Sequence, residues 1–218
     1  MNYHDLILHP SFLPYLSRID GDIALFFKKK GCPCGGVLDR ADFRRKKGFG
    51  ITEASGEEAR RRDSFCCRED GCRCRLTPPS IRFLHGMWFA SAVIVLLSAM
   101  QHGITPERRA QLQRQLGVSR QTIDRWRKWW QETFVPCEMW RVWRARCQLR
   151  DKEGLPDGLL RILRESAETP PHALVLVCTL IGCWRIADPT SIFTIVQGRL
   201  ADDDFPQNMC ADGTNGDG

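Results

Sequence analysis

Two short cysteine-containing stretches, Cys32-Pro-Cys34-Gly-Gly36 and Phe65-Cys-Cys67-Arg-Glu-Asp-Gly-Cys72, decide the fold of the N-terminal half of this chain. Each stretch brings two thiols close together, which is what a tetrahedral Zn²⁺ site with sulfur ligands requires. The glycines at 35, 36 and 71 supply tight backbone turns that let amide groups approach sulfur. The stretches therefore predict a small β zinc ribbon over residues 31–82, held by a structural Zn²⁺ with the ligands Cys32, Cys34, Cys67 and Cys72.

The choice among neighbouring cysteines depends on strand geometry. Phe65 stands two residues before Cys67, so both side chains share one strand face and the ring can pack under the metal. This argument selects Cys67 over Cys66. The cysteines within the pairs are separated by one and four residues, whereas two is usual in a ribbon, so Cys66 and Cys74 remain alternative ligands. Ordinary buried cysteines in a basic loop region are the alternative to a metal site.

No histidine or glutamate has the relation to the four thiols that a catalytic zinc needs, so the predicted metal is structural. The chain holds eleven cysteines, an odd number, and its N-terminus has no basic stretch followed by an apolar run and a cleavage site. A reducing compartment is therefore expected, with a cytoplasmic, nucleoid-associated location. The apolar runs 87–100 and 173–184 are 14 and 12 residues long. A membrane helix needs roughly 20 residues, so no membrane partner is expected.

Positive charge is concentrated in the two segments that carry the cysteine pairs and the helix-turn-helix pattern. Residues 28–75 carry 14 basic and 8 acidic side chains, residues 106–152 carry 12 and 5, and residues 188–218 carry 1 and 6. This is the footprint of a nucleic-acid-binding protein, with a solvated basic surface as the plain alternative. The insertion between the cysteine pairs is polar and glycine-containing, so it predicts an exposed loop whose basic run could contact phosphates: Arg44, Arg45, Lys46 and Lys47.

The fold class expected is mainly α with a small β zinc ribbon (α+β), and a helix-turn-helix followed by a helical C-terminal region. Ser80 is the expected cap of an apolar helix over 81–100, and further helices are expected at 105–116, 119–134, 137–150, 156–166 and 171–183. The segments are a helical lead-in (1–30), the ribbon with its basic insertion (31–82), a helical domain containing the helix-turn-helix at 105–134 (83–150), C-terminal helices (151–190) and a disordered acidic tail (191–218).

The helix-turn-helix prediction depends on apolar spacing across the glycine turn at Gly117. The positions Leu112, Leu116, Val118, Ile123 and Trp126 would pack two short helices against each other. The positions of the second helix expected to be exposed carry side chains suited to base edges and phosphates: Arg120, Gln121, Thr122, Asp124, Arg125 and Lys128. An amphipathic helical hairpin with a solvated polar face is the alternative. The tryptophans at helical spacings from 126 to 143 are expected in the core rather than stacked on bases.

The order of these motifs resembles the N-terminal part of bacterial insertion-sequence transposases. The resemblance covers residues 31–134 and includes Phe65-Cys-Cys67, Gly71-Cys72, Thr77-Pro-Pro-Ser80 and Leu116-Gly-Val-Ser-Arg120. It also extends to a group of short bacterial proteins of the same layout. It implies a zinc ribbon and a helix-turn-helix ahead of an RNase-H-like catalytic domain.

That catalytic domain is not expected here. An RNase-H-like core needs strands ending in acids that bind two metal ions, whereas the chain after residue 134 has helical patterns and no such acids. The prediction is a sequence-specific DNA-binding protein associated with a mobile element, without enzymatic activity. Its expected partners are double-stranded DNA, a transposase or recombinase chain in trans, and a second copy of the chain. The alternatives are a transcriptional regulator, a zinc-ribbon adaptor for other proteins, and a fragment or partner subunit of a transposase.

Overall fold

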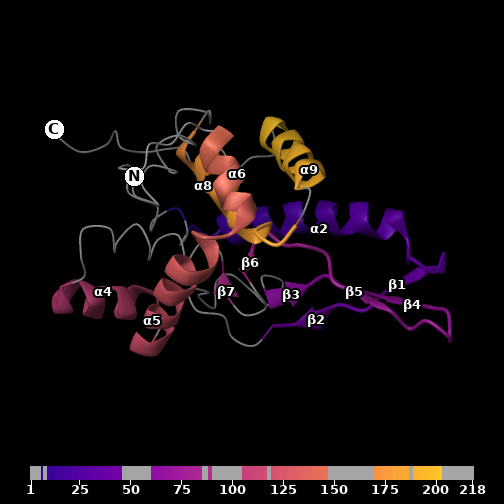
Figure 1. The fold of residues 1–218 in the computed structure, drawn as a ribbon, viewed down its shortest axis with the longest axis horizontal. Coiled ribbons are helices and arrows are strands. Elements are labelled where there is room, and N and C mark those ends of the chain that lie inside the picture. Colours follow the sequence, from indigo (N-terminus) through magenta and orange to yellow (C-terminus); the bar gives the residue numbers. More distant parts are fainter. Residues whose placement is uncertain are drawn as a thin grey trace.

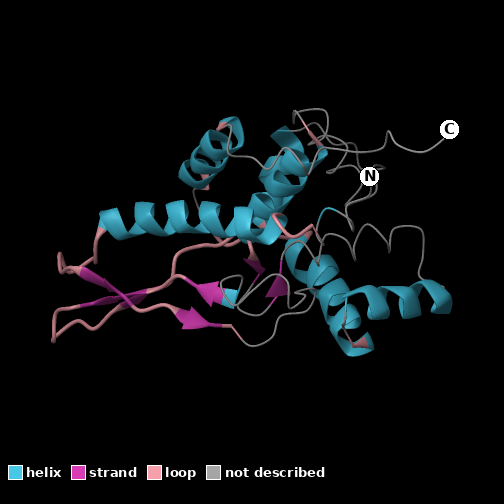
Figure 2. Cartoon of the chain, turned by 180° about the vertical axis from the view of Figure 1, so that it is seen from behind, coloured by secondary structure: helices cyan, strands magenta, loops and turns pink. Residues whose placement is uncertain are grey.

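The computed structural model describes residues 6, 9–45, 60–84, 88–89, 105–116, 119–146, 169–186 and 189–202. This part of the chain is mainly helical with small antiparallel sheets (Figures 1 and 2), as the sequence predicted. Its helices are α2 (Phe12–Lys30), α4 (Pro106–Leu116), α5 (Arg120–Trp129), the π-helical turn η3 (Trp130–Phe134), α6 (Glu138–Arg146), α8 (Pro170–Gly182) and α9 (Thr190–Ala201). Its strands are β1 (Leu38–Arg40), β2 (Phe43–Arg44), β3 (Arg61–Arg62), β4 (Phe65–Cys67), β5 (Arg75–Leu76), β6 (Phe83–Leu84) and β7 (Trp88–Phe89).

Helix α2 is the lead-in helix that the sequence predicted. Its buried residues Phe12, Leu16, Ile19 and Ile23 recur every three or four positions, so one face of the helix is apolar. The helix ends at Gly31, whose φ of 75° is a conformation that glycine adopts without strain. Three lysines occupy the last turn, where the helix dipole favours positive charge.

Strands β1 to β4 form one continuous antiparallel hairpin, which we call the long hairpin. Leu38 lies opposite Cys67 and Arg40 opposite Phe65, and the same register continues to Arg44 opposite Arg61. The Ala41 amide donates to the Ser64 carbonyl between the β1–β4 and β2–β3 pairs, and the Arg45 amide donates to the Arg60 carbonyl just beyond β2 and β3. Residues 38–45 and 60–67 therefore pair without a slip. Strand β5 pairs with the other edge of β4, which completes a three-stranded sheet of order β1-β4-β5.

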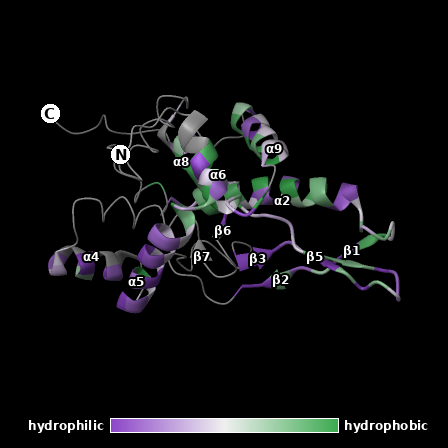
Figure 3. Cartoon of the chain, in the orientation of Figure 1, coloured by the Kyte–Doolittle hydropathy of each residue, from purple (hydrophilic) through white to green (hydrophobic). Residues whose placement is uncertain are grey.

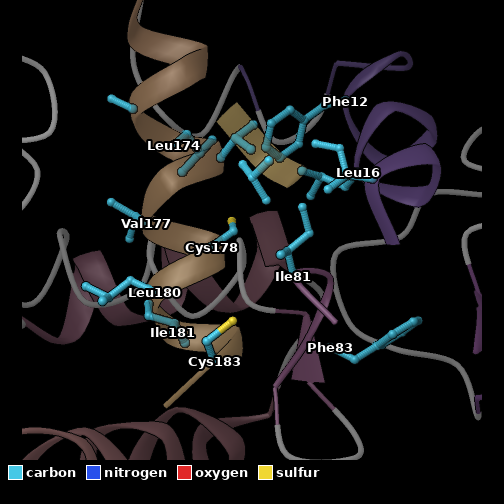
Figure 4. Close-up of a cluster of buried hydrophobic side chains, with 14 of the residues drawn as sticks. Phe12, Leu16, Ile81, Phe83, Leu174, Val177, Cys178, Leu180, Ile181 and Cys183 are labelled. Atoms are coloured by element: carbon cyan, nitrogen blue, oxygen red, sulfur yellow. The ribbon is translucent and has the colours of Figure 1, made fainter. Parts of the chain in front are cut away.

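The larger core lies between α2 and α8 (Figure 4). Phe12 and Leu16 of α2 face Leu174 and Cys178 of α8, and residues 81 and 83 lie below them. Burying one such aliphatic or aromatic side chain contributes about 1.5–3 kcal/mol. Helices α5 and α9 also contribute buried residues to this core: Ile123, Trp126 and Trp129, and Ile192 and Val196. Helix α8 starts where a Thr169 side chain accepts a hydrogen bond from the His172 amide.

A buried ion pair joins α2 to the segment that leaves the sheet. Asp20 accepts hydrogen bonds from the Ser80 hydroxyl (2.5 Å), the Ile81 amide (2.8 Å) and Nε of Arg82 (2.7 Å). Arg82 also donates to the carbonyl of Arg61 (2.9 Å) and lies 3.8 Å from Asp63. Both charged side chains are about as buried as the apolar core, at 1% exposure for Asp20 and Arg82. The pair fixes the long hairpin against α2.

Two predictions about secondary structure were wrong. An apolar helix was expected over 81–100, but residues 83–84 and 88–89 form strands β6 and β7, with Phe83 opposite Phe89. The Ser80 hydroxyl accepts from the amides of Arg82 and Phe83 in a turn that Asp20 holds, rather than capping a helix. Aromatic residues also favour strands. The disordered tail was expected to begin at 191, but residues 190–201 form α9, because Ile192 and Val196 are buried in the larger core.

Other expected features fall on residues that the structure does not describe. They are most of the 81–100 segment, the basic insertion at 46–59, the turn at 117–118, the helix at 156–166 and the acidic residues after 202. Where helices were expected and are described, the starts agree closely. Helix α4 begins at Pro106, α6 at Glu138 and α8 at Pro170.

Candidate metal centre

The four predicted ligands come together at one end of the long hairpin. Cys32 and Cys34 lie in the turn that follows α2, Cys67 ends β4, and Cys72 lies in the turn before β5. Their sulfur atoms all lie within 4.8 Å of one another. Cys32 and Cys72 are 3.7 Å apart, and Cys34 and Cys67 are 3.5 Å apart. The prediction that these four cysteines form a cluster is confirmed.

The spacing of the sulfur atoms discriminates between a disulfide and a metal site. A disulfide bond has a sulfur–sulfur distance of about 2.05 Å, and the four thiols are free. A tetrahedral Zn²⁺ with bonds of about 2.3 Å places its sulfur ligands about 3.8 Å apart. The measured 3.5 and 3.7 Å are close to that edge length. The cluster can therefore hold a tetrahedral ion with little movement of the backbone.

Backbone amides are directed at three of the four sulfur atoms. The Gly36 amide donates to Sγ of Cys34 at 3.4 Å, and the amides of residues 69 and 74 donate to Cys67 and Cys72. In each case the donor is two residues after the cysteine. The turns that allow this contain residues with positive φ, namely Gly35 at 84° and Arg73 at 45°. Amide donors of this kind stabilise the negative charge of thiolates.

A small apolar core lies under the cluster and decides which cysteines belong to it. Ala24, Leu38 and Phe65 are buried together with Cys32 and Cys67. Because β4 alternates, Phe65 and Cys67 are buried while Cys66 is turned to the other side of the strand, as the sequence predicted. The Cys66 sulfur contacts the backbone carbonyls of residues 67 and 73 instead. Among the described residues, neither Cys66 nor Cys74 belongs to the cluster.

The crowded thiols influence one another's ionisation. The Gly36 amide, and after it the thiols of Cys32, Cys67 and Cys72, lower the pKa of Cys34 to about 7. The Glu69 amide lowers the pKa of Cys67, but burial and the three neighbouring thiols outweigh it and raise the pKa to about 12. Four thiolates at this spacing repel one another, so a divalent cation is what would allow all of them to ionise.

The second predicted site is the polar face of α5. Ser119 caps this helix by accepting from the Thr122 amide at 3.3 Å, as the sequence predicted. Arg120, Gln121, Arg125 and Lys128 are exposed. Thr122 is not, because its hydroxyl lies between the Ser119 hydroxyl and the Arg125 guanidinium at 1% exposure. The prediction that Thr122 is exposed was wrong, and it can serve this helix only as a structural residue.

The inner face of α5 is fixed by packing. Ile123, Trp126 and Trp129 are buried, and Trp130 stacks on Phe134 with ring centroids 4.5 Å apart. The prediction that the tryptophan cluster belongs to the core is confirmed for residues 126, 129, 130 and 140. The exposed face carries ion pairs along the helix, Arg120 with Asp124 at 3.9 Å and Lys128 with Glu132 at 3.7 Å. Exposed pairs of this kind contribute little and can exchange partners.

The basic run at 44–47 is only partly described. Arg44 is exposed at the end of β2, as predicted, whereas Arg45 is half-buried and lies over the rings of Phe43 and Phe83. Lys46 and Lys47 lie outside the described residues. Arg61 was not among the predicted residues, and the hairpin register places it directly opposite Arg44. The run Arg60-Arg61-Arg62 was visible in the sequence, but its pairing partner was not.

Within the described chain, none of the helices has both the length and the apolar character needed to cross a membrane. Comparison with protein-family models, with curated proteins and with solved structures gives no match to this chain.

Proposed function

We propose that this chain is a sequence-specific, zinc-stabilised DNA-binding protein of a mobile element, and that it has no catalytic activity of its own. The observation that carries the proposal is the division of α5 into two faces. Its inner face is fixed in the core by Ile123, Trp126 and Trp129, and its outer face presents Arg120, Gln121, Arg125 and Lys128. A firmly held helix with arginine and glutamine near its N-terminus is the element that reads bases in a major groove.

In this proposal α4 and α5 form a helix-turn-helix and α5 is the recognition helix. A helix with its side chains is about 10–12 Å across, and the major groove of B-DNA is about 12 Å wide. Arg120 and Gln121 stand in the first turn of α5, where side chains reach base edges. Arg125 and Lys128 stand farther along the helix and are suited to phosphates.

The metal in this proposal is structural zinc in a zinc ribbon. Four cysteines at near-tetrahedral spacing would fill the coordination sphere of the ion, which leaves no open position for a substrate or a water molecule. The small core beneath the site is a second argument for a structural role. Among the described residues its buried members are Ala24, Cys32, Leu38, Phe65 and Cys67, so the metal would supply much of the stability of this part of the chain.

The proposal is tested by incubating the purified, zinc-loaded protein with fragmented genomic DNA at physiological salt and sequencing the retained fragments. Inverted repeats at the ends of mobile elements are expected to be enriched. Enrichment of promoters instead would favour a transcriptional regulator, which uses the same motifs. Enrichment of no sequence would contradict sequence-specific binding of DNA.

A separate test distinguishes the residues of α5 proposed to contact bases from those proposed to contact phosphates. Replacement of Arg120 or Gln121 by alanine is expected to cost about 1–3 kcal/mol on the preferred site and to relax the preference at one base pair. The matched variant Lys128→Ala is expected to weaken binding equally on all sequences. Equal behaviour of the two sets would refute the assignment of α5 as the recognition helix.

A protein-interaction adaptor is the second candidate, because two large apolar side chains of the N-terminal part of the chain are exposed. Leu25 of α2 and Val37, next to the Gly36 turn, are each 56% exposed. In that case the metal module would bind another protein, and the basic charge would be incidental. Salt-dependent binding to duplex DNA would argue against this candidate.

A further inference from the structure

The sulfur atoms of the cysteine cluster make close contacts between two separate turns. Sγ of Cys32 lies 3.7 Å from Sγ of Cys72, and Sγ of Cys34 lies 3.5 Å from Sγ of Cys67. The partners are 40 and 33 positions apart in the sequence. In each pair one cysteine follows α2 and the other belongs to β4 or to the turn before β5. Each pair therefore connects the end of α2 to the three-stranded sheet, and we call this part of the chain the cysteine module.

The spacing within these pairs also suits a second kind of cross-link. A disulfide bond has a sulfur–sulfur distance of about 2.05 Å, so each sulfur would move toward its partner by about 0.8 Å. Cys34 and Cys67 both lie against the backbone of Gly36, where a Cβ atom would be 3.2 and 2.7 Å from their sulfur atoms. The lack of a side chain at Gly36 therefore lets these two sulfurs approach each other.

The four cysteines differ in their access to solvent. Cys34 is exposed, Cys72 is half-buried, and Cys32 and Cys67 are buried. In Figures 1 and 2 the sheet β1-β4-β5 and the C-terminal end of α2 extend from one end of the molecule, beyond α8 and α9. Oxidation of cysteine follows exposure, so a dissolved hydroperoxide would react first with Cys34. The buried sulfur of Cys67 would then be reached from Cys34 rather than from solvent.

The cysteine module has little apolar core to maintain its fold. Figure 3 shows strong hydrophobic colour on α2 and α8, the helices of the larger core. The buried residues of the small core include two of the cysteines themselves, Cys32 and Cys67. A cross-link between the two turns is therefore important for stability. Bonds between residues 33 or 40 positions apart restrict the unfolded chain more than a bond within one turn would.

We propose that the cluster is a site of reversible oxidation, at which a hydroperoxide converts the four thiols into the disulfides Cys34–Cys67 and Cys32–Cys72. The module then loses Zn²⁺ but keeps its fold, because both disulfides join the same two turns that the metal joins. The inference rests on the zinc site of the proposed function and not on DNA binding. Disulfides that form in a reducing compartment are usually transient and redox-sensing, which agrees with a reversible modification.

The reaction balances with one molecule of hydrogen peroxide for each disulfide. The sulfur of Cys34 attacks one peroxide oxygen, the O–O bond breaks, and a sulfenic acid and one water form. The sulfur of Cys67 then attacks the sulfenic sulfur, the S–O bond breaks, and the disulfide and a second water form. Two thiols thereby lose the two electrons that reduce the peroxide. Cys32 and Cys72 react with a second molecule in the same way, and Zn²⁺ dissociates without a change of oxidation state because its ligands are thiolates rather than disulfides.

The test treats full-length, reduced, zinc-loaded protein with hydrogen peroxide in a Cys66→Ser/Cys74→Ser background, which removes the two neighbouring cysteines outside the cluster. A chromophoric chelator follows the metal. We expect about one Zn²⁺ to be released for every two molecules of peroxide consumed. A dithiol reductant followed by added zinc is expected to restore the starting protein.

Peptide mapping under non-reducing conditions identifies the paired cysteines. Trypsin yields peptides 31–40, 63–68 and 69–73, so Cys67 and Cys72 lie on separate peptides. Fragmentation between Cys32 and Pro33 separates the first cysteine from Cys34. The fragment with Cys32 is expected to carry peptide 69–73, and the fragment with Cys34 is expected to carry peptide 63–68.

Two matched variants test whether Cys34 is the residue that reacts first. Both Cys34→Ala and Cys72→Ala remove one sulfur from the cluster, but only Cys34→Ala removes the exposed one. Cys72→Ala is expected to form the Cys34–Cys67 disulfide at the rate of the four-cysteine protein. Cys34→Ala is expected to form its remaining disulfide several-fold more slowly. Equal rates in the two variants would contradict the role of Cys34.

Hydrogen exchange of β4 separates this inference from simple loss of the metal. Oxidised, metal-free protein is expected to keep the amide protection that reduced, metal-free protein loses. Disulfides within one turn, the opposite cross-turn pairing, sulfinic acids in place of disulfides, or unprotected β4 amides after oxidation would overturn the inference. So would metal that stays bound at peroxide concentrations that oxidise glutathione. Reduced protein that takes up no Zn²⁺ would instead overturn the zinc site of the proposed function.

Discussion

The replacement Asp20→Asn tests whether the buried ion pair holds the two parts of the protein together. Asp20 accepts three hydrogen bonds, and its partner Arg82 is equally buried. An asparagine can keep one acceptor toward the Ile81 amide, but its amide hydrogens would face the donors of Ser80 and Arg82. Removing one charge from a buried pair costs about 3–5 kcal/mol, because the other charge stays in the interior without compensation.

The assay is urea unfolding of the zinc-loaded protein followed by tryptophan fluorescence, since Trp126, Trp129 and Trp140 are buried in the larger core. Asp20→Asn is expected to lower the urea midpoint without changing the dependence on urea. Asp22→Asn is the matched control, because Asp22 pairs with Arg199 while 27% exposed. That variant is expected to cost less than about 1 kcal/mol.

The double variant Asp20→Asn/Arg82→Met is the third protein to measure, because it also removes the charge of Arg82, which Asp20→Asn alone leaves buried without a partner. It is expected to be more stable than Asp20→Asn alone, since an uncharged pair leaves no buried ion without a partner. Asp20→Asn within about 1 kcal/mol of the wild type, or a double variant whose loss is the sum of the two single losses, would refute the reasoning.

Three further predictions concern the metal centre and the core. Cys67→Ser is expected to lower zinc affinity by more than the roughly 10–100-fold typical of outer-shell changes, and Cys66→Ser to leave it unchanged, in competition with a chromophoric chelator; equal losses would contradict the ligand assignment. Zinc removal is expected to abolish the hydrogen-exchange protection of β4 but not of α8, and β4 amides that stay protected would show that this strand folds without metal. Gly182→Ala would place a Cβ 2.3 Å from the Ser80 carbonyl oxygen, so a loss of about 1–3 kcal/mol in urea unfolding is expected. Gly198→Ala has open space and is expected to gain up to about 1 kcal/mol; a stable Gly182→Ala variant would disprove the close contact between α8 and Ser80.

Local patterns were sufficient for much of the structure. The cysteine cluster could be predicted because paired thiols and turn glycines are short-range features, and the choice of Cys67 over Cys66 followed from strand alternation. The start of α5 followed from the capping side chain of Ser119. Even the unusual spacing of the cysteines forms a four-sulfur cluster, because Gly35 and Arg73 adopt positive φ.

These short-range patterns did not predict contacts between residues that are far apart in the sequence. The partner of Arg82 is Asp20, 62 positions earlier in the chain, and no periodicity connects them. Arg61 could not be matched to Arg44, because the length of the intervening insertion does not determine the register of the hairpin. The burial of Thr122 was also missed, because its hydroxyl contacts the side chains of Ser119 and Arg125, whereas a threonine in the first turn of a polar helix looks exposed in the sequence.

Helix α2 connects the two cores, because residues of this one helix are buried in both of them. Residues 12–23 are packed in the larger core, Ala24 belongs to the small core, and Cys32 follows one residue after the helix end. The helix has 19 residues and is about 28 Å long, so a rotation of α2 about the larger core would displace its C-terminal end. About 10 Å of the helix, residues 24–30, extends beyond its last residue buried in the larger core, so a tilt of about 10° about that core would move the cysteine end by about 2 Å. If the cluster binds an ion, as proposed, ion binding at one end of α2 and the packing of its other end in the larger core would influence each other.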